Sequence, residues 1–251
     1  MESAIASSGA SAAAERGKVA FVKLAISCLV YAFICLAALA ANPERALKVE
    51  NSTFHSAGPG QGVAVELSLV NISRRTITAW AGSVEGHYPD GTTRTTQFTV
   101  DYISELLPAG AEHREFRGNT TRSESVMLPA GAAGALPVSV NATVQMVALD
   151  DDSALGDATL IRQLASERRS RARTMTELLE AVAQARHAPD AKAALKALVE
   201  KHDPKGRSIM WQQLRPDWGP AHLDAVISGY TATRDLLVQH SNLKEVLEND
   251  R

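Results

Sequence analysis

The densest charge in the chain lies on a predicted helix, and it offers the first possible chemistry. Residues 167–173 contain four arginines, which are Arg168, Arg169, Arg171 and Arg173. Guanidinium groups donate paired hydrogen bonds to phosphate and carboxylate oxygens, so this cluster suits a phosphate or another acidic polymer. The alternative is an exposed, solvated helix face. Arg168 falls on the apolar side of that helix, where it either extends its charge to solvent or pairs with a carboxylate from the sheet.

Two tryptophans form the second candidate site. Trp211 and Trp218 flank the polar segment 212–217. Indole rings pack on other surfaces and anchor partner proteins, so this pair suits a glycan or a protein surface. The alternative is that both rings fill the seam between helices and strands. The predicted binding residues are therefore Trp211, Trp218, Arg168, Arg169, Arg171 and Arg173.

An acidic stretch is a third candidate site. Asp150, Asp151, Asp152 and Asp157 suggest calcium, but the glycine and glutamate that an EF-hand loop needs are missing at their positions. We expect instead an acidic loop that stabilises the positive end of the following helix. The seven histidines form no H-x-x-H pair, and no serine lies in a G-x-S-x-G context. The sequence therefore predicts no metal, no cofactor and no enzymatic activity.

Composition limits the class of partner. The formal net charge is −2, which gives no electrostatic reason to expect nucleic acid as a partner. Alanine is abundant, which is typical of a bacterial protein from a GC-rich genome. Asn51, Asn71, Asn119 and Asn141 each begin an Asn-x-Ser/Thr triplet. These are glycosylation acceptors in eukaryotic secreted proteins, whereas in a bacterial chain they would serve turns and polar strand faces.

The elements that must position these residues fall into two regions, the first of which is residues 45–150. Apolar residues there recur with the period of two that half-buried strands show. Asp90-Gly91 lies between two such stretches, which is a hairpin signal. The predicted strands lie at 47–53, 63–69, 76–88, 92–102, 113–117, 124–128 and 138–148. This density of strands predicts an immunoglobulin-like antiparallel β-sandwich.

The same region also carries a family resemblance. The residues concerned are Val65 to Ser73, Ile77-Thr78-Ala79, Asp90-Gly91 and Leu107-Pro108-Ala109-Gly110. They resemble the FxLYD-like and immunoglobulin-like sandwiches of bacterial envelope proteins, whose function is uncharacterised. The chain departs from that pattern in its Leu-Pro-Ala-Gly turn and in having no Phe-x-Leu-Tyr-Asp string. The resemblance covers less than half of the chain, implies an extracytoplasmic interaction module and assigns no catalytic residue.

The second region, residues 154–250, changes to a helical period. Apolar residues spaced by three and four predict a long helix that Asp157 caps and that runs to about residue 187. Further helices are predicted at 190–202, 220–237 and 241–247, the last one capped by Ser241. A short turn or helix is predicted at 208–214. Pro220 suits the first turn of its helix.

One apolar run, residues 19–41, predicts the compartment. From Leu24 onward it is uncharged and long enough to span a bilayer, whereas Ala38-Leu39-Ala40 matches a signal-peptidase site. The basic residues on its N-terminal side favour a cytoplasmic N-terminus. Two alternatives stay open, a single-pass inner-membrane anchor or a signal peptide cleaved after Ala40 to release a periplasmic or secreted protein. Residues 1–18 are predicted to form a disordered arm. Both cysteines lie inside the run, so no disulfide is expected in the exported part.

These observations predict an α+β protein with an N-terminal apolar helix, either transmembrane or signal. An immunoglobulin-like antiparallel β-sandwich at 45–150 and a helical region at 154–250 complete the expected fold. The predicted function is a non-catalytic structural or protein-interaction module of the bacterial envelope. An extracytoplasmic glycan- or polymer-binding protein is the alternative. The expected partners are the membrane, through the N-terminal helix, and another envelope protein or polymer.

Overall fold

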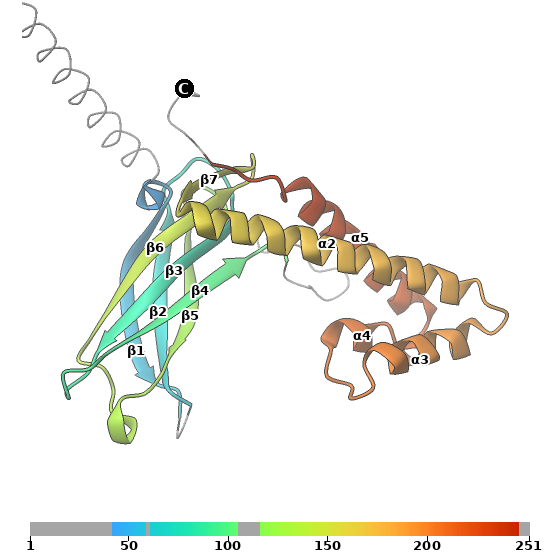
Figure 1. Cartoon of the computed structure of the whole chain (residues 1–251), viewed down its shortest axis with the longest axis horizontal. Helices are drawn as coiled ribbons and strands as arrows, with labels where there is room; N and C mark the ends of the chain where they lie inside the picture. Colours follow the sequence, from blue (N-terminus) through green and yellow to red (C-terminus); the bar gives the residue numbers. More distant parts are fainter. Residues whose placement is uncertain (1–41, 59–60, 105–115, 246–251) are drawn as a thin grey trace, which may run out of the picture. The chain divides into compact units, whose positions relative to one another are not determined.

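The computed structural model describes residues 42–58, 61–104 and 116–245 (Figure 1). The apolar run 19–41 and the arm before it lie outside these residues, so the predictions made for them stay predictions. Within the described ranges, no helix combines the length and the apolar character that crossing a bilayer requires. The described part is an α+β fold, with two sheets of mainly antiparallel strands followed by helices.

The first sheet has three antiparallel strands in the order β1-β2-β5. These are β1 (Leu47–Ser56), β2 (Val63–Asn71) and β5 (Thr121–Leu128). The central strand β2 alternates apolar residues with Glu66 and Ser68, and its residues Val63, Val65, Leu67 and Leu69 are buried. Strands that alternate in this way bury one face and leave the other to solvent.

The second sheet has five strands in the order β4-β3-β6-β7-β8. They are β3 (Ile77–His87), β4 (Thr93–Asp101), β6 (Ser139–Leu149), β7 (Ser153–Gly156) and β8 (Lys244–Glu245). The predicted hairpin between β3 and β4 is confirmed, and the amide and hydroxyl of Thr92 both donate to the carboxylate of Asp90. Strand β8 pairs in parallel with β7 and brings the end of the described chain to the edge of the sheet.

The inner faces of the two sheets share one hydrophobic core. Valines and leucines of β2 pack there with Trp80 and Val84 of β3 and with Val144 and Val147 of β6. The Trp80 ring meets the Phe98 ring edge to face, with centroids 4.9 Å apart. Burial of this much apolar surface is the main force that holds two sheets together.

Within the described residues, four α-helices follow β7. They are α2 (Ala158–Arg186), α3 (Ala191–His202), α4 (Ile209–Gln213) and α5 (Pro220–Gln239). Short 3₁₀ turns are η1 (Pro43–Arg45), η2 (Ala132–Gly134) and η3 (Pro216–Trp218). The predicted cap at Asp157 is confirmed, because its carboxylate accepts from the amides of Thr159 and Leu160. Asp190 caps α3 in the same way and accepts from the amide of Ala193.

Helix α2 belongs to two hydrophobic clusters. Ile161 and Leu164, in its first half, pack on small residues of the second sheet such as Ala79 and Ala81. Its second half packs with α3 and α5 through residues such as Met175. Helix α5 runs antiparallel to α2, since Arg186 near the end of α2 pairs with Asp224 near the start of α5.

Two features of the C-terminal region differ from the sequence prediction. The predicted helix after Ser241 is wrong, because the Ser241 hydroxyl donates to the carbonyl of Val238 and the chain then enters β8. The amide of Lys244 donates to the carbonyl of Asp152, and this bond holds the new strand on the sheet. The region predicted to be helical from residue 154 likewise begins with β7. Of the strand predicted at 113–117, residues 113–115 lie outside the described part, and Phe116 forms a bridge with Ile77.

Candidate functional site

The helical register of α2 separates the four arginines of the predicted cluster. The buried stripe of the helix includes Ala165, Arg168 and Ala172, so Arg168 points inward with no exposed surface. Arg171 and Arg173 are exposed on the outside of the helix. The structure therefore does not bring the four guanidinium groups onto one surface.

Arg168 lies in a fully bonded network between the second sheet and the helices. Its Nη2 donates to Asp101 Oδ1 at 2.8 Å and to Thr78 Oγ1 at 3.2 Å. Its Nε donates to Asp101 Oδ2 at 3.3 Å, and its Nη1 donates to the carbonyl oxygen of His240 at 2.9 Å. The predicted pairing of Arg168 with a carboxylate from the sheet is confirmed. Every nitrogen of this guanidinium is used inside the chain, so Arg168 serves structure in this conformation.

The neighbouring Arg169 has a related structural contact. Its Nη1 donates to the carbonyl oxygen of Ser241 at 3.0 Å. Arg168 and Arg169 thus both bond carbonyls just after the C-terminal end of α5. Cations are favourable there, because the last carbonyls of a helix are unpaired and carry partial negative charge.

A histidine–aspartate pair completes this junction. His240 Nδ1 lies 2.8 Å from Asp152 Oδ1, and the histidine is 5% exposed. Asp152 has a positive φ of 65° at the tight turn between β6 and β7. The sequence did not predict the contacts of Asp101, Asp152 and His240, since no local pattern relates residues that are 67 to 88 positions apart.

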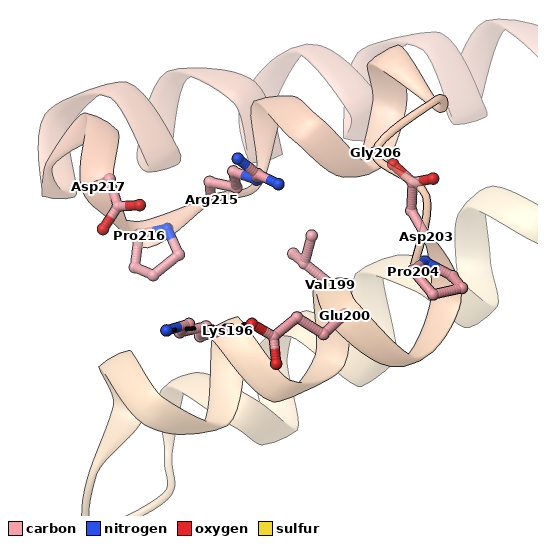
Figure 2. A pocket seen from close by; sticks show the side chains of 9 residues that line it. All are labelled: Lys196, Val199, Glu200, Asp203, Pro204, Gly206, Arg215, Pro216 and Asp217. Carbon is pink, nitrogen blue, oxygen red and sulfur yellow. Dashed lines mark ion pairs between the residues drawn. The ribbon is translucent and has the colours of Figure 1, made fainter.

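A groove lies at the other end of the helical region, between α3 and η3 (Figure 2). Its volume is about 340 Å³. Val199 contributes apolar surface to the groove, and Pro204 and Pro216 lie at its two ends (Figure 2). The lining residues are Lys196, Val199, Glu200, Asp203, Pro204, Gly206, Arg215, Pro216 and Asp217. Charged side chains of both signs therefore surround a small apolar floor.

Asp203 fixes the loop that closes one end of the groove. Its carboxylate accepts from the side chain of Gln212 at 2.6 Å and from the amides of Arg207 and Ser208 at 2.8 and 3.1 Å. These hydrogen bonds, that of Gln212 foremost, with the nearby charge of Arg215, lower the pKa of Asp203 below its ordinary value. The loop 203–208 is therefore held in shape by a charged carboxylate.

This arrangement predicts a pH-dependent difference between the natural chain and Asp203→Asn. A carboxylate whose pKa is lowered on folding stabilises the fold above its ordinary pKa of about 3.9, and the stabilisation is lost as the pH falls through the lowered value. We expect Asp203→Asn to have a lower Tm at neutral pH, and we expect the gap to close on acidification. Thermal unfolding at a series of pH values measures this. The exposed Asp235→Asn serves as control, and an equal effect of both variants would contradict the assigned role.

Of the two candidate tryptophans, the structure describes the side chain of one. Trp211 is half-buried on α4 and stacks on the imidazole of His202, with ring centroids 4.6 Å apart and planes at 11°. The hydroxyl of Tyr230 on α5 donates to the carbonyl of Met210, the residue before Trp211, and this bond holds α4 on α5. The backbone of Trp218 ends η3, and its side chain lies outside the described part.

The structure also shows the contacts of the acidic residues and of one asparagine motif. Among the residues that the structure covers, no group of three or more His, Cys, Asp or Glu side chains could hold a metal ion. Asp151 accepts from the amide and hydroxyl of Ser153, and Asp157 caps α2. Asn71 is completely buried, so its amide is closed to a glycan.

Comparison with other proteins gives little further information. The chain matches no protein-family model and no curated protein. A hypothetical protein from Peptoclostridium difficile 630, of known crystal structure, is similar at 12% sequence identity and a TM-score of 0.30. The match covers 48% of this chain and 91% of that chain. A likeness at this level assigns neither a fold nor a function.

Proposed function

We propose that the chain is a membrane-anchored or exported protein of the bacterial envelope that acts as a non-catalytic structural or protein-interaction module. The observation that carries this proposal is the groove between α3 and η3, with mixed charges around an apolar floor. A surface of this kind suits a polypeptide segment, because apolar contact supplies affinity and charge complementarity supplies specificity. The exported location rests on the apolar run 19–41.

The finer fold within this proposal is an immunoglobulin-like β-sandwich. Its support is the strand order β1-β2-β5 opposite β4-β3-β6-β7, which follows from Greek-key connections between two sheets. The core that the two inner faces share is consistent with such a sandwich. The resemblance to FxLYD-like envelope sandwiches points the same way and remains part of the proposal.

The helices are proposed to present the groove from a fixed base. Arg168 joins α2 to β3 and β4 and also to the carbonyl that follows α5. Binding a partner on a pre-organised surface avoids the entropy cost of ordering that surface at the moment of binding. The buried network is therefore a positioning device in this proposal, and the groove is the contact site.

Site-specific photocrosslinking in living bacteria tests the proposed docking site. A photoreactive residue would replace exposed Pro204, which lines the groove, and in a second strain exposed Thr174 on α2. We expect a discrete crosslinked protein from position 204 only. Arg215→Glu should remove that product, whereas Arg173→Glu, a charge reversal outside the groove, should leave it. Identical products from both positions would contradict docking in the groove.

A second candidate function is binding of a glycan or another envelope polymer. The observation that favours it is Trp211, which keeps part of its indole surface exposed beside His202. Co-sedimentation of the full chain with purified peptidoglycan tests this alternative. Binding that is lost in Trp211→Ala but retained in Arg173→Glu, with Tm unchanged, would favour the polymer over a protein partner.

A further inference from the structure

The end of the sheets next to η1 carries a cationic surface. Three connections meet there, namely η1 before β1, the turn between β2 and β3, and the segment before β5. These connections carry four exposed cationic side chains, and Lys48, the second residue of β1, adds a fifth. The five residues are Arg45, Lys48, Arg74, Arg75 and Arg117. We call these five side chains, together with Ile72, the basal surface. Ile72 is a large hydrophobic residue that is nonetheless 46% exposed at this place.

Buried Asn71 holds these connections together. Its Nδ2 donates to the carbonyl of Arg75 at 2.9 Å and to that of Phe116 at 2.8 Å. Its Oδ1 accepts from the amide and hydroxyl of Ser73. The amide of Ile72 donates to the carbonyl of Ala46, which ties η1 to the same turn. The basal surface therefore stands on a fixed backbone rather than on independent loops.

A glycine keeps two of these connections in contact. A Cβ at Gly118 would lie 2.7 Å from the carbonyl oxygen of Ser73 and 2.8 Å from the carbonyl carbon of Arg74. Only a residue without a side chain permits that approach. Arg74 and Arg117 are consequently presented by two backbones that touch.

The acidic residues of the same end leave positive charge in excess. Arg75 pairs with Asp151 at 3.0 Å and lies 3.7 Å from Asp150. Among the described residues, Arg45, Lys48 and Arg74 make no ion pair with a carboxylate, and all three are exposed. The described carboxylates at this end also include Glu44 and Asp152, and Asp152 bonds His240 instead of an arginine. Within the described residues, Glu44, Asp150 and Asp151 are therefore left to oppose the five cations. An exposed isoleucine amid arginines is the composition of a surface that meets lipid at a membrane interface.

The position of the basal surface in the chain indicates which ligand it meets. The apolar run ends at Ala41, and η1 begins at Pro43. One residue spans at most about 3.6 Å, and the headgroup layer on each side of a bilayer is about 5–8 Å thick. We propose that the basal surface binds the phosphate headgroups of anionic phospholipids in the membrane that holds the run 19–41. This inference rests on the anchored form of the proposed function, because a cleaved chain has no such constraint.

The opposite end of the sheets provides the internal comparison. Exposed Val138 lies just before β6, and β6 begins where β3 ends, far from η1. Strand β1 alone has 10 residues, so about 33 Å separate the two ends. A lipid that contacts the basal surface does not reach Val138.

The test places the full chain in lipid nanodiscs with a photoreactive residue at position 72 or at position 138. The discs contain phosphatidylcholine alone or phosphatidylcholine mixed with phosphatidylglycerol, and mass spectrometry detects lipid adducts. We expect phosphatidylglycerol adducts from position 72 and several-fold fewer or none from position 138. The triple variant Arg45→Glu, Lys48→Glu and Arg74→Glu should reduce the adducts at position 72 about tenfold or more, because each cation near an anionic surface contributes severalfold.

The matched control reverses three exposed cations elsewhere, Arg171→Glu, Arg173→Glu and Lys192→Glu. It should leave the adducts at position 72 unchanged. Equal labelling in the two lipid mixtures, or equal labelling from positions 72 and 138, would overturn the headgroup site while leaving the anchor intact. A chain that is cleaved and leaves the membrane fraction would overturn the anchor and the headgroup site together, and fractionation before the labelling distinguishes these outcomes.

Discussion

Replacement of Arg168 by leucine is expected to lower the free energy of unfolding by about 3–5 kcal/mol. The substitution leaves the Asp101 carboxylate, with 10% of its side chain exposed, without its cation. It also removes a donor from Thr78 and from the His240 carbonyl at the same place. Breaking one side of a buried pair is costly because the remaining charge stays desolvated. Urea unfolding of the full chain in detergent, followed by circular dichroism, measures the change.

The control lies one helical turn away on the same helix. Arg171→Leu alters an exposed arginine, and we expect it to change stability by less than about 0.5 kcal/mol. A double variant that replaces both Arg168 and Asp101 with apolar residues should recover part of the loss, since no unpaired charge then remains. If Arg168→Leu unfolds at the same urea concentration as the natural chain, the buried pair is not formed in solution.

The second large effect is expected at Gly156, the last residue of β7. This residue has a φ of +108°, and a Cβ there would lie 2.1 Å from the carbonyl oxygen of Gln145. That same carbonyl accepts the amide of Asp157, the residue that caps α2. Gly156→Ala is therefore expected to cost about 3 kcal/mol or more, since backbone strain and overpacking each cost about 1–3 kcal/mol. The same urea titration measures it.

Gly229→Ala is the matched control for this prediction. Gly229 lies inside α5, and a Cβ there would meet no atom within 4 Å. Alanine suits a helix interior better than glycine, so this variant should be more stable by about 0.5–1 kcal/mol. Gly156→Ala with the stability of the natural chain would contradict the close packing of β7 against β6 that places α2.

Much of the fold could be predicted from local patterns. The alternation of apolar and polar residues predicted β2 and β6, and the Asp90-Gly91 turn predicted the hairpin. Asp157 and Asp190 indicated the starts of α2 and α3. Each of these signals acts between residues near in sequence, where propensity and capping are decided. The placement of Arg168 on a buried stripe also followed from helical spacing alone.

The features that the sequence did not predict depend on distant partners. Strand β8 has two residues, and it forms because the carbonyl of Asp152 and the edge of β7 accept it as a neighbour. Its own residues, Lys244 and Glu245, have no strand preference, so a capping serine suggested helix instead. The groove was not predicted for the same reason, since Lys196 and Arg215 line one groove only after α3 and η3 have packed. Tertiary contacts decided both features.

The buried role of Asn71 shows how one motif supports different interpretations. Its triplet is compatible with a glycosylation acceptor or with a turn, and the sequence alone left both open. In the folded chain its side chain bonds the carbonyls of Arg75 and Phe116, which lie on two different connections. Only the second of these contacts crosses between distant segments, and it is the one that no local pattern indicates.

The proposal that residues 42–251 function outside the cytoplasm is tested most directly by locating them in a bacterial host. The full chain would be expressed, the cells fractionated, the N-terminus sequenced and protease added to intact spheroplasts. We expect added protease to digest the folded part, whether the chain is intact in the membrane or begins at Ala41 as a released protein. An intact chain that is recovered in the cytosol and becomes protease-sensitive only after lysis would contradict it.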